Sequence, residues 1–285
     1  MKKLEKNIYI EDQYPGVTLG ALVLPEGTVM IDAPPRPDDG RAWLASLRGL
    51  GTSQERLLVV LDAHPDRALG ARALESPIMA QQASLSIFNQ RTSIFKAQMQ
   101  GSGSEWEECG GLSGIRWLLP NLTFDDHAVV HWGEEEIHLE HHPGPQPGAA
   151  WLLLTDRQVA FIGDAVPVKQ PPFMQHANIA AWLDTLELLQ KQPYKEYTLI
   201  SSRGGAVPQA EIRNLRGFLK DIRSRLERLA KRQAPPADTE KIVSKLLQKY
   251  KYPTKYRDMY SARLRYGLYH YYARHYHPAP QPEGS

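Results

Sequence analysis

The sequence predicts an α/β protein in which buried strands alternate with helices. The β-forming run at 57–61 is typical of a buried strand, and a polar cluster follows it at 62–67. Residues 40–50 have the periodicity of an amphipathic helix and precede a glycine. Polar and apolar residues alternate along 126–133 and 136–141, a pattern typical of two antiparallel strands with one face in solvent. A length of 285 residues is sufficient for one large α/β domain and an appended segment.

The polar cluster is the hexapeptide D-A-H-P-D-R at residues 62–67. The ends of buried strands are where α/β proteins place their chemistry, so these side chains are candidates for a functional site. The hexapeptide resembles the H-x-H-x-D-H metal-binding loop of the metallo-β-lactamase superfamily. His64 and Asp66 are retained, whereas Asp62 and Arg67 stand where that motif has its first and last histidines.

Four further segments resemble this superfamily, in the same order along the chain. They are an opening strand hairpin at 17–33, a strand and loop for the third ligand at 137–148, a strand ending in Gly-Asp at 159–165, and a last strand with its loop at 197–205. The resemblance covers roughly residues 8–230. It implies a four-layer αββα sandwich, in which two β-sheets pack face to face and helices cover the outside.

In the family pattern, three histidines hold one zinc ion, an aspartate and two histidines hold a second, and another aspartate bridges them. The bridging carboxylate is retained as Asp164, but Pro145 and Arg203 occupy the positions of two histidines. Zinc requires three or four N, S or O donors at about 2 Å. A guanidinium has no lone pair to donate and is not deprotonated in proteins. Because Arg67 and Arg203 replace both histidines of the second zinc site, we expect that site to be empty.

Charge balance indicates what replaces the metals. The resemblance brings Asp62, Asp66 and Asp164 together in a buried pocket, where uncompensated charge is costly. Arg67 and Arg203 can neutralise two of these carboxylates through charge-assisted hydrogen bonds. We therefore predict a salt-bridge cluster of these five residues in place of the cations, and no bound cofactor. On this hypothesis, which we favour, the protein is catalytically degenerate and binds a small molecule or a protein partner in the former active-site cleft.

A metal-dependent alternative stays open. Asp62, His64 and Asp164 could together hold one zinc or another divalent ion, with water completing the coordination. The protein would then be a mononuclear hydrolase of an ester, thioester, lactone or phosphoester. Asp66 would orient the attacking water, and Arg203 would stabilise the developing oxyanion.

Further segments are expected around this pocket. Residues 84–100 are predicted to be helical and 101–104 to form a break, in the region that covers the pocket in the superfamily. The loop at 168–175 is expected to form another wall. Most histidines are predicted to face solvent on the two antiparallel strands. His142 lies next to the loop of Pro145, so we assign both residues to the pocket.

The composition changes after Pro208, where basic residues become frequent. We divide the chain into a metallo-β-lactamase-like domain at 1–232 and a C-terminal helical extension at 233–285. Three helices are predicted in this part of the chain, at 210–232, 239–250 and 256–276.

The last predicted helix interleaves tyrosines with arginines, a composition that can stack bases and contact phosphates. An apolar stripe with helical spacing runs along it, made of Tyr256, Tyr260, Leu264, Leu268 and Tyr271. This stripe could pack on the domain, or on a second copy in a homodimer. Because a net charge of +2 gives little long-range attraction for nucleic acid, we predict packing and consider nucleic-acid binding unlikely.

Composition restricts the remaining classes. Cys109 is the only cysteine, so the chain can form neither an internal disulfide nor a Cys-x-x-Cys zinc site. The basic N-terminus has no apolar run behind it, and nowhere do 18 apolar residues occur together. We expect a soluble cytoplasmic protein with neither a signal peptide nor a membrane span.

Overall fold

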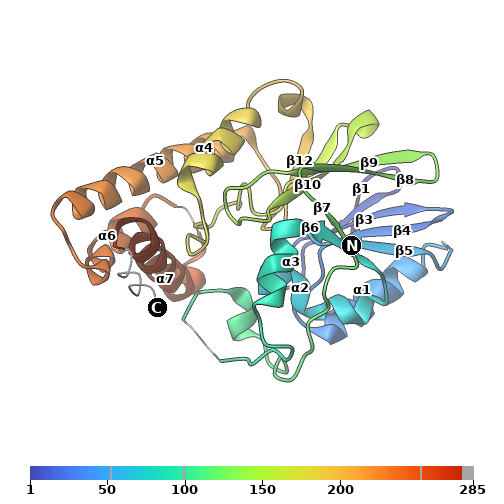
Figure 1. Cartoon of the computed structure of the whole chain (residues 1–285). Helices are drawn as coiled ribbons and strands as arrows, with labels where there is room; N and C mark the ends of the chain where they lie inside the picture. Colours follow the sequence, from blue (N-terminus) through green and yellow to red (C-terminus); the bar gives the residue numbers. More distant parts are fainter. Residues whose placement is uncertain (52, 99–100, 251, 278–285) are drawn as a thin grey trace, which may run out of the picture.

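Two β-sheets packed face to face form the centre of the molecule (Figure 1). The computed structural model describes residues 1–51, 53–98, 101–250 and 252–277. The first sheet has the strand order β1 to β7, with β1 to β4 antiparallel and β4 to β7 parallel. Its strands are β1 (Lys2–Glu5), β2 (Ile8–Glu11), β3 (Leu19–Leu24), β4 (Gly27–Ile31), β5 (Arg56–Val59), β6 (Ile78–Gln81) and β7 (Leu122–Phe124).

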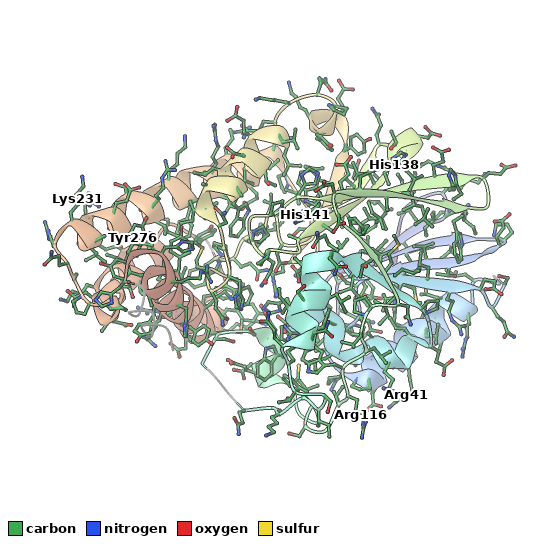
Figure 2. All side chains as sticks on the ribbon, viewed as in Figure 1. Arg41, Arg116, His138, His141, Lys231 and Tyr276 are labelled. Atoms are coloured by element: carbon green, nitrogen blue, oxygen red, sulfur yellow. The ribbon has the colours of Figure 1, made fainter. Side chains whose placement is uncertain are left out.

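The second sheet has the order β13-β12-β11-β10-β9-β8, and only β11 and β12 pair in parallel within it. Its strands are β8 (His127–Trp132), β9 (Glu135–His141), β10 (Ala150–Leu154), β11 (Val159–Phe161), β12 (Thr198–Ser201) and β13 (Gly205–Ala206). Apolar side chains of both sheets meet between them, among them Leu22, Ile31, Leu139 and Phe161. On the two hairpin strands β8 and β9, His127, His131 and His138 alternate with the inward-facing residues and point outward, and Figure 2 shows His138 on this surface. His141, at the end of β9, instead has the parity of the buried Ile137 and Leu139.

Helices cover both outer faces. The helices are α1 (Pro37–Arg48), α2 (Pro65–Ala68), α3 (Gln82–Asn89), α4 (Ile179–Leu188), α5 (Gln209–Lys231), α6 (Glu240–Leu247) and α7 (Arg257–Tyr276). Short 3₁₀ turns lie at Leu69–Leu74, Glu105–Glu108, Thr155–Arg157, Tyr194–Glu196, Pro236–Thr239 and Thr254–Tyr256. Trp43 of α1 packs on the first sheet, and Trp182 of α4 packs on the second. The predicted four-layer αββα sandwich with a C-terminal helical extension is therefore confirmed.

The C-terminal helices share a core with the sandwich. Side chains from α4, α5, α6 and α7 form one buried cluster that includes Trp182, Phe218, Leu246 and Leu268. The apolar stripe of α7 lies in this cluster, because Tyr260, Leu264, Leu268 and Tyr271 are all buried there. Within the described residues, the region 1–232 is thus continuous in its packing with the helices that follow it up to residue 277. None of the described helices is long and apolar enough to cross a membrane.

The predicted helix at 84–100 is wrong beyond Asn89. The helix α3 ends there, and residues 90–98 form a loop, while 99 and 100 lie outside the described residues. The cause is tertiary contact. Arg91 donates to the carbonyl of Ala63 at 2.6 Å, and the backbone N–H of Phe95 donates to the carbonyl of Ile115 at 2.7 Å.

Candidate functional site

Four strand ends bring the candidate residues to one edge of the sandwich. Asp32 directly follows β4, the segment 62–67 follows β5, Asp164 follows β11 and Arg203 follows β12. Because β4 pairs in parallel with β5, and β11 with β12, the carboxyl ends of each pair lie at the same edge of their sheet. The polar segments after these strands therefore meet.

Arg67 lies fully buried between carboxylates. Its Nε is 3.1 Å from Oδ1 of Asp62, its Nη2 forms a close ion pair with Oδ1 of Asp164, and its Nη1 is 3.5 Å from Oδ2 of Asp32. The cluster predicted from the sequence contains Arg67, Asp62 and Asp164, and Asp32 is an additional member that was not predicted.

Asp32, at the end of β4, contacts the segments that follow β5 and β12. It adopts a left-handed backbone conformation, with φ of 61°. Its carboxylate accepts hydrogen bonds from the backbone N–H of Leu61 at 2.9 Å and from the hydroxyl of Ser202 at 2.6 Å. The guanidinium of Arg67 is therefore held by a carboxylate whose own position is set by the loops after β5 and β12.

Arg203 reaches three carboxylates. Its Nε donates to Asp164 at 3.0 Å, its Nη2 to Asp66 at 2.9 Å and its Nη1 to Glu105 at 2.8 Å. Nη1 also donates to the carbonyl of Gly16 at 2.9 Å. Gly16 has φ of 75°, and a Cβ there would lie 2.8 Å from Cγ of Asp66, so only glycine allows this approach. Arg203 is thus fixed from four directions.

Glu105 and Arg263 extend the cluster into the C-terminal helix. Nη2 of Arg263, a fully buried side chain of α7, donates to Glu105 at 2.6 Å. The guanidinium carbons of Arg203 and Arg263 lie 4.5 and 4.1 Å from the centre of the Phe173 ring. Phe173, from the loop expected to form a wall, therefore contacts both cations.

His64 takes part through its Nδ1 atom. Nδ1 is 3.2 Å from the backbone nitrogen of Asp66 and 3.1 Å from Nη2 of Arg203. Since both of these groups are donors, Nδ1 accepts and the proton of the neutral ring is assigned to Nε2. Burial and the charge of Arg203 lower the pKa of His64 well below its usual range. The ring is therefore neutral at pH 7.

The carboxylates of the cluster differ in their affinity for protons. Burial raises the pKa of Asp32 to about 6 and that of Asp66 to about 7, although the nearby arginines oppose the shift. Burial also raises the pKa of Asp62. For Asp164, burial is outweighed by Arg203 and Arg67, so its pKa lies well below its usual range. Asp164 is thus the ionised carboxylate to which both guanidinium groups bind.

We expect the Asp66→Asn substitution to become increasingly stabilising relative to the parent as the pH rises from 5 to 8. The folded protein holds the Asp66 proton up to a pKa of about 7, whereas the unfolded chain releases it near its ordinary pKa of about 3.9. Stability therefore decreases between these values as the pH rises, and asparagine abolishes that decrease. In urea unfolding, the difference in free energy of unfolding between the variant and the parent should grow by at least about 1 kcal/mol from pH 5 to pH 8. The exposed Asp156→Asn substitution is the control, and a pH-independent difference for Asp66→Asn would contradict the assignment.

The residues at this edge do not fit two zinc ions. Guanidinium groups lie at two histidine positions of the resemblance and occupy the oxygens of Asp164 that a metal would need. Asp66 is also engaged on both oxygens, because Oδ1 accepts from the backbone N–H of Trp106 at 2.8 Å and Oδ2 binds Arg203. Within the described ranges, no group of three or more His, Cys, Asp or Glu side chains is arranged to hold a metal ion.

The structure separates the two remaining pocket candidates. Pro145 is buried in the loop between β9 and β10, next to Gln146, which lines a cavity together with His64. His142 contacts other residues: its Nε2 is 2.7 Å from Glu140, and its ring stacks on Trp151 at 3.7 Å between centroids. Of the two, only Pro145 neighbours a residue of this cavity.

Sequence reasoning missed Glu105 and Arg263. Both belong to segments outside the matched motifs, and the composition of α7 drew attention to its tyrosines rather than to one arginine. Their meeting depends on how closely the covering loop approaches α7, since a Cβ at Gly103 would lie 2.3 Å from the carbonyl of Met259.

Comparisons with known proteins agree with this fold. The sequence profile described as metallo-beta-lactamase superfamily matches residues 16–199. No curated protein sequence matches the chain. Among solved structures, the stereoselective inverting sec-alkylsulfatase Pisa1 from Pseudomonas sp. is similar with a TM-score of 0.70 at 15% identity, over 96% of this chain and 49% of that one. The chain thus spans about half the length of the sulfatase.

Two shorter proteins are similar over most of their own length. The metallo-beta-lactamase from Pontibacter korlensis has a TM-score of 0.58 at 16% identity, covering 77% of this chain and 97% of that one. The DIM-1 metallo-beta-lactamase has a TM-score of 0.59 at 15% identity, with 77% and 96% covered. At these identities the likeness to solved structures shows the fold alone.

Proposed function

The chain belongs to the metallo-beta-lactamase superfamily, and we propose that it is a catalytically degenerate member that binds a ligand in the former active-site cleft. The ligand is a small molecule or a protein partner. One observation carries this proposal: Asp164, which stands where the family has its bridging carboxylate, is bound on one oxygen by Arg67 and on the other by Arg203.

The two guanidinium groups replace the charge of the metals but not their chemistry. A zinc ion in an open site lowers the pKa of its bound water to near 7 and so generates a nucleophile. A guanidinium offers only N–H donors, which here are directed at carboxylates, the carbonyl of Gly16 and Nδ1 of His64. Both oxygens of Asp66 already accept hydrogen bonds, from Trp106 and Arg203, and the side chain is fully buried, so it is not open to solvent as a group that orients an attacking water should be. This arrangement supports binding rather than hydrolysis.

We expect the protein purified without chelator to contain well under one zinc per chain. The reason is that zinc binding would require Arg67 and Arg203 to leave carboxylates that they neutralise in a buried site. Elemental analysis after growth with added zinc measures this directly.

A variant with restored ligands is the matched control for the same assay. Arg67→His, Pro145→His and Arg203→His together return three imidazoles to the family positions and remove two guanidinium groups. We expect this triple variant to take up zinc and to unfold at a higher temperature when zinc is present. Two tightly held zinc ions in the parent would contradict the proposal. If the parent instead held one zinc ion per chain, and the Asp62→Asn variant lost it, the mononuclear hydrolase would become the favoured function.

A further inference from the structure

A cavity of about 350 Å³ lies beside the salt-bridge cluster and is lined by His64 and Phe173. Its other apolar walls come from the covering segment and α3, and they are Ile87, Phe95, Trp106 and Trp117. Its volume is near the lower end for small-molecule sites. None of its lining residues is an aspartate or a glutamate, whereas Arg91 and Lys96 both line it.

Arg91 is a cation without an acidic partner among the described residues. Its Nη2 donates to the carbonyl of Ala63 at 2.6 Å, and its guanidinium carbon lies 4.3 Å from the centre of the Trp117 ring. Its Nη1 is buried and has no hydrogen-bond partner in the part of the chain that the structure describes. Burial lowers the pKa of Arg91 to about 10, so the group is charged at pH 7. A buried donor of this kind is costly unless it is paired.

The aromatic walls are held in place by one another. The ring of Phe95 meets those of Trp106 and Trp117 edge to face, with centroid distances of 5.0 and 5.5 Å. Such pairs restrict ring rotation and present a preformed apolar surface. The cavity therefore combines flat apolar walls with positive charge from Arg91 and Lys96.

We propose that this cavity binds an amphipathic anion, with one anionic head paired to Arg91 and a flat apolar body between the aromatic walls. The head is an oxyanion, and carboxylate, sulfonate and phosphate share the chemistry that a guanidinium recognises. The inference rests on the proposed binding role of the cleft and names the class of ligand. It involves no metal.

Isothermal titration calorimetry with two matched probes tests it. Naphthalene-2-sulfonate is an amphipathic anion, and naphthalene-2-sulfonamide has the same body with a neutral head. We expect the parent to bind the sulfonate at least tenfold more tightly than the sulfonamide. Arg91→Gln should abolish this preference. Arg116→Gln removes an exposed arginine of the same segment outside the cavity, near the lower edge of Figure 2, and should leave it unchanged.

A second variant keeps the test decisive if the Arg91→Gln protein does not fold. Ile87→Trp keeps the cation but fills the cavity, and it should weaken binding of the sulfonate and the sulfonamide alike. Naphthalene-2-carboxylate and 2-naphthyl phosphate, measured in the same way, identify which head the site prefers. Equal affinity of the parent for sulfonate and sulfonamide would overturn the inference, as would full sulfonate binding in both cavity variants.

Failure here can be distinguished from failure of the proposed function. A parent that lacks zinc but binds no probe refutes the ligand class and leaves the degenerate site intact. A parent that holds two zinc ions refutes the degenerate site, whatever the probes do.

Discussion

Arg203→Ala should lower the free energy of unfolding by about 3 kcal/mol. The side chain is buried and binds Asp66, Glu105 and Asp164. Its removal leaves these carboxylates without the cation that they share, and a buried charge that has lost its partner is strongly destabilising. For a chain of this size such a loss corresponds to a decrease of several degrees in melting temperature.

Thermal and urea unfolding of matched variants measure this effect. Arg41→Ala removes an arginine whose ion pair with Asp38 is exposed, so we expect a change within about 0.5 kcal/mol. Arg203→Lys keeps the charge but not the fork of donors, so it should lie between the parent and Arg203→Ala. Adding Asp164→Asn to Arg203→Ala should recover part of the loss, because it removes one unpaired carboxylate. An Arg203→Ala protein as stable as the parent would show that the cluster is solvated.

Leu268→Ala in α7 should destabilise the protein by about 3 kcal/mol. Leu268 is fully buried in the cluster shared by α4, α5, α6 and α7, so truncation leaves a cavity in the common core. The adjacent Tyr269 has 45% of its surface exposed, and Tyr269→Ala should change stability by no more than about 0.5 kcal/mol. Urea unfolding of the two variants compares neighbouring positions of one helix.

Truncation after Pro253 is the stronger form of this test. Because it removes all of α7, it should leave apolar surface exposed and give an insoluble or unfolded protein. A truncated protein that stays folded would contradict this account. If the full chain in addition bound single-stranded RNA with a steep salt dependence, α7 would be a nucleic-acid surface instead.

The sequence predicts the sandwich well because its strand ends carry recognisable side chains. Asp62, His64 and Asp66 lie in the loop that follows one run of buried β-formers, and Asp164 and Arg203 lie just after two others. The resemblance to the superfamily, carried by these segments in their order, implied that the side chains come together. The parallel pairing of β4 with β5 and of β11 with β12 then places these strand ends at one edge.

Contacts that depend on distant segments could not be predicted in this way. Glu105 and Arg263 are 158 positions apart, and only the packing of α7 against the covering loop brings them together. The end of α3 is another example, since its continuation beyond Asn89 is prevented by contacts of the following loop with residues 63 and 115. Helical propensity is a weak preference that such contacts override.

X-ray diffraction from crystals grown with zinc, recorded on both sides of the zinc absorption edge, decides whether guanidinium groups or a metal ion neutralise Asp164. We expect the guanidinium groups of Arg67 and Arg203 to lie against the two oxygens of Asp164, as they do here at 3.0 Å for Nε of Arg203. We also expect no anomalous peak between Asp62, His64 and Asp164. A strong zinc peak among these three side chains, with both arginines turned away from Asp164, would contradict both expectations.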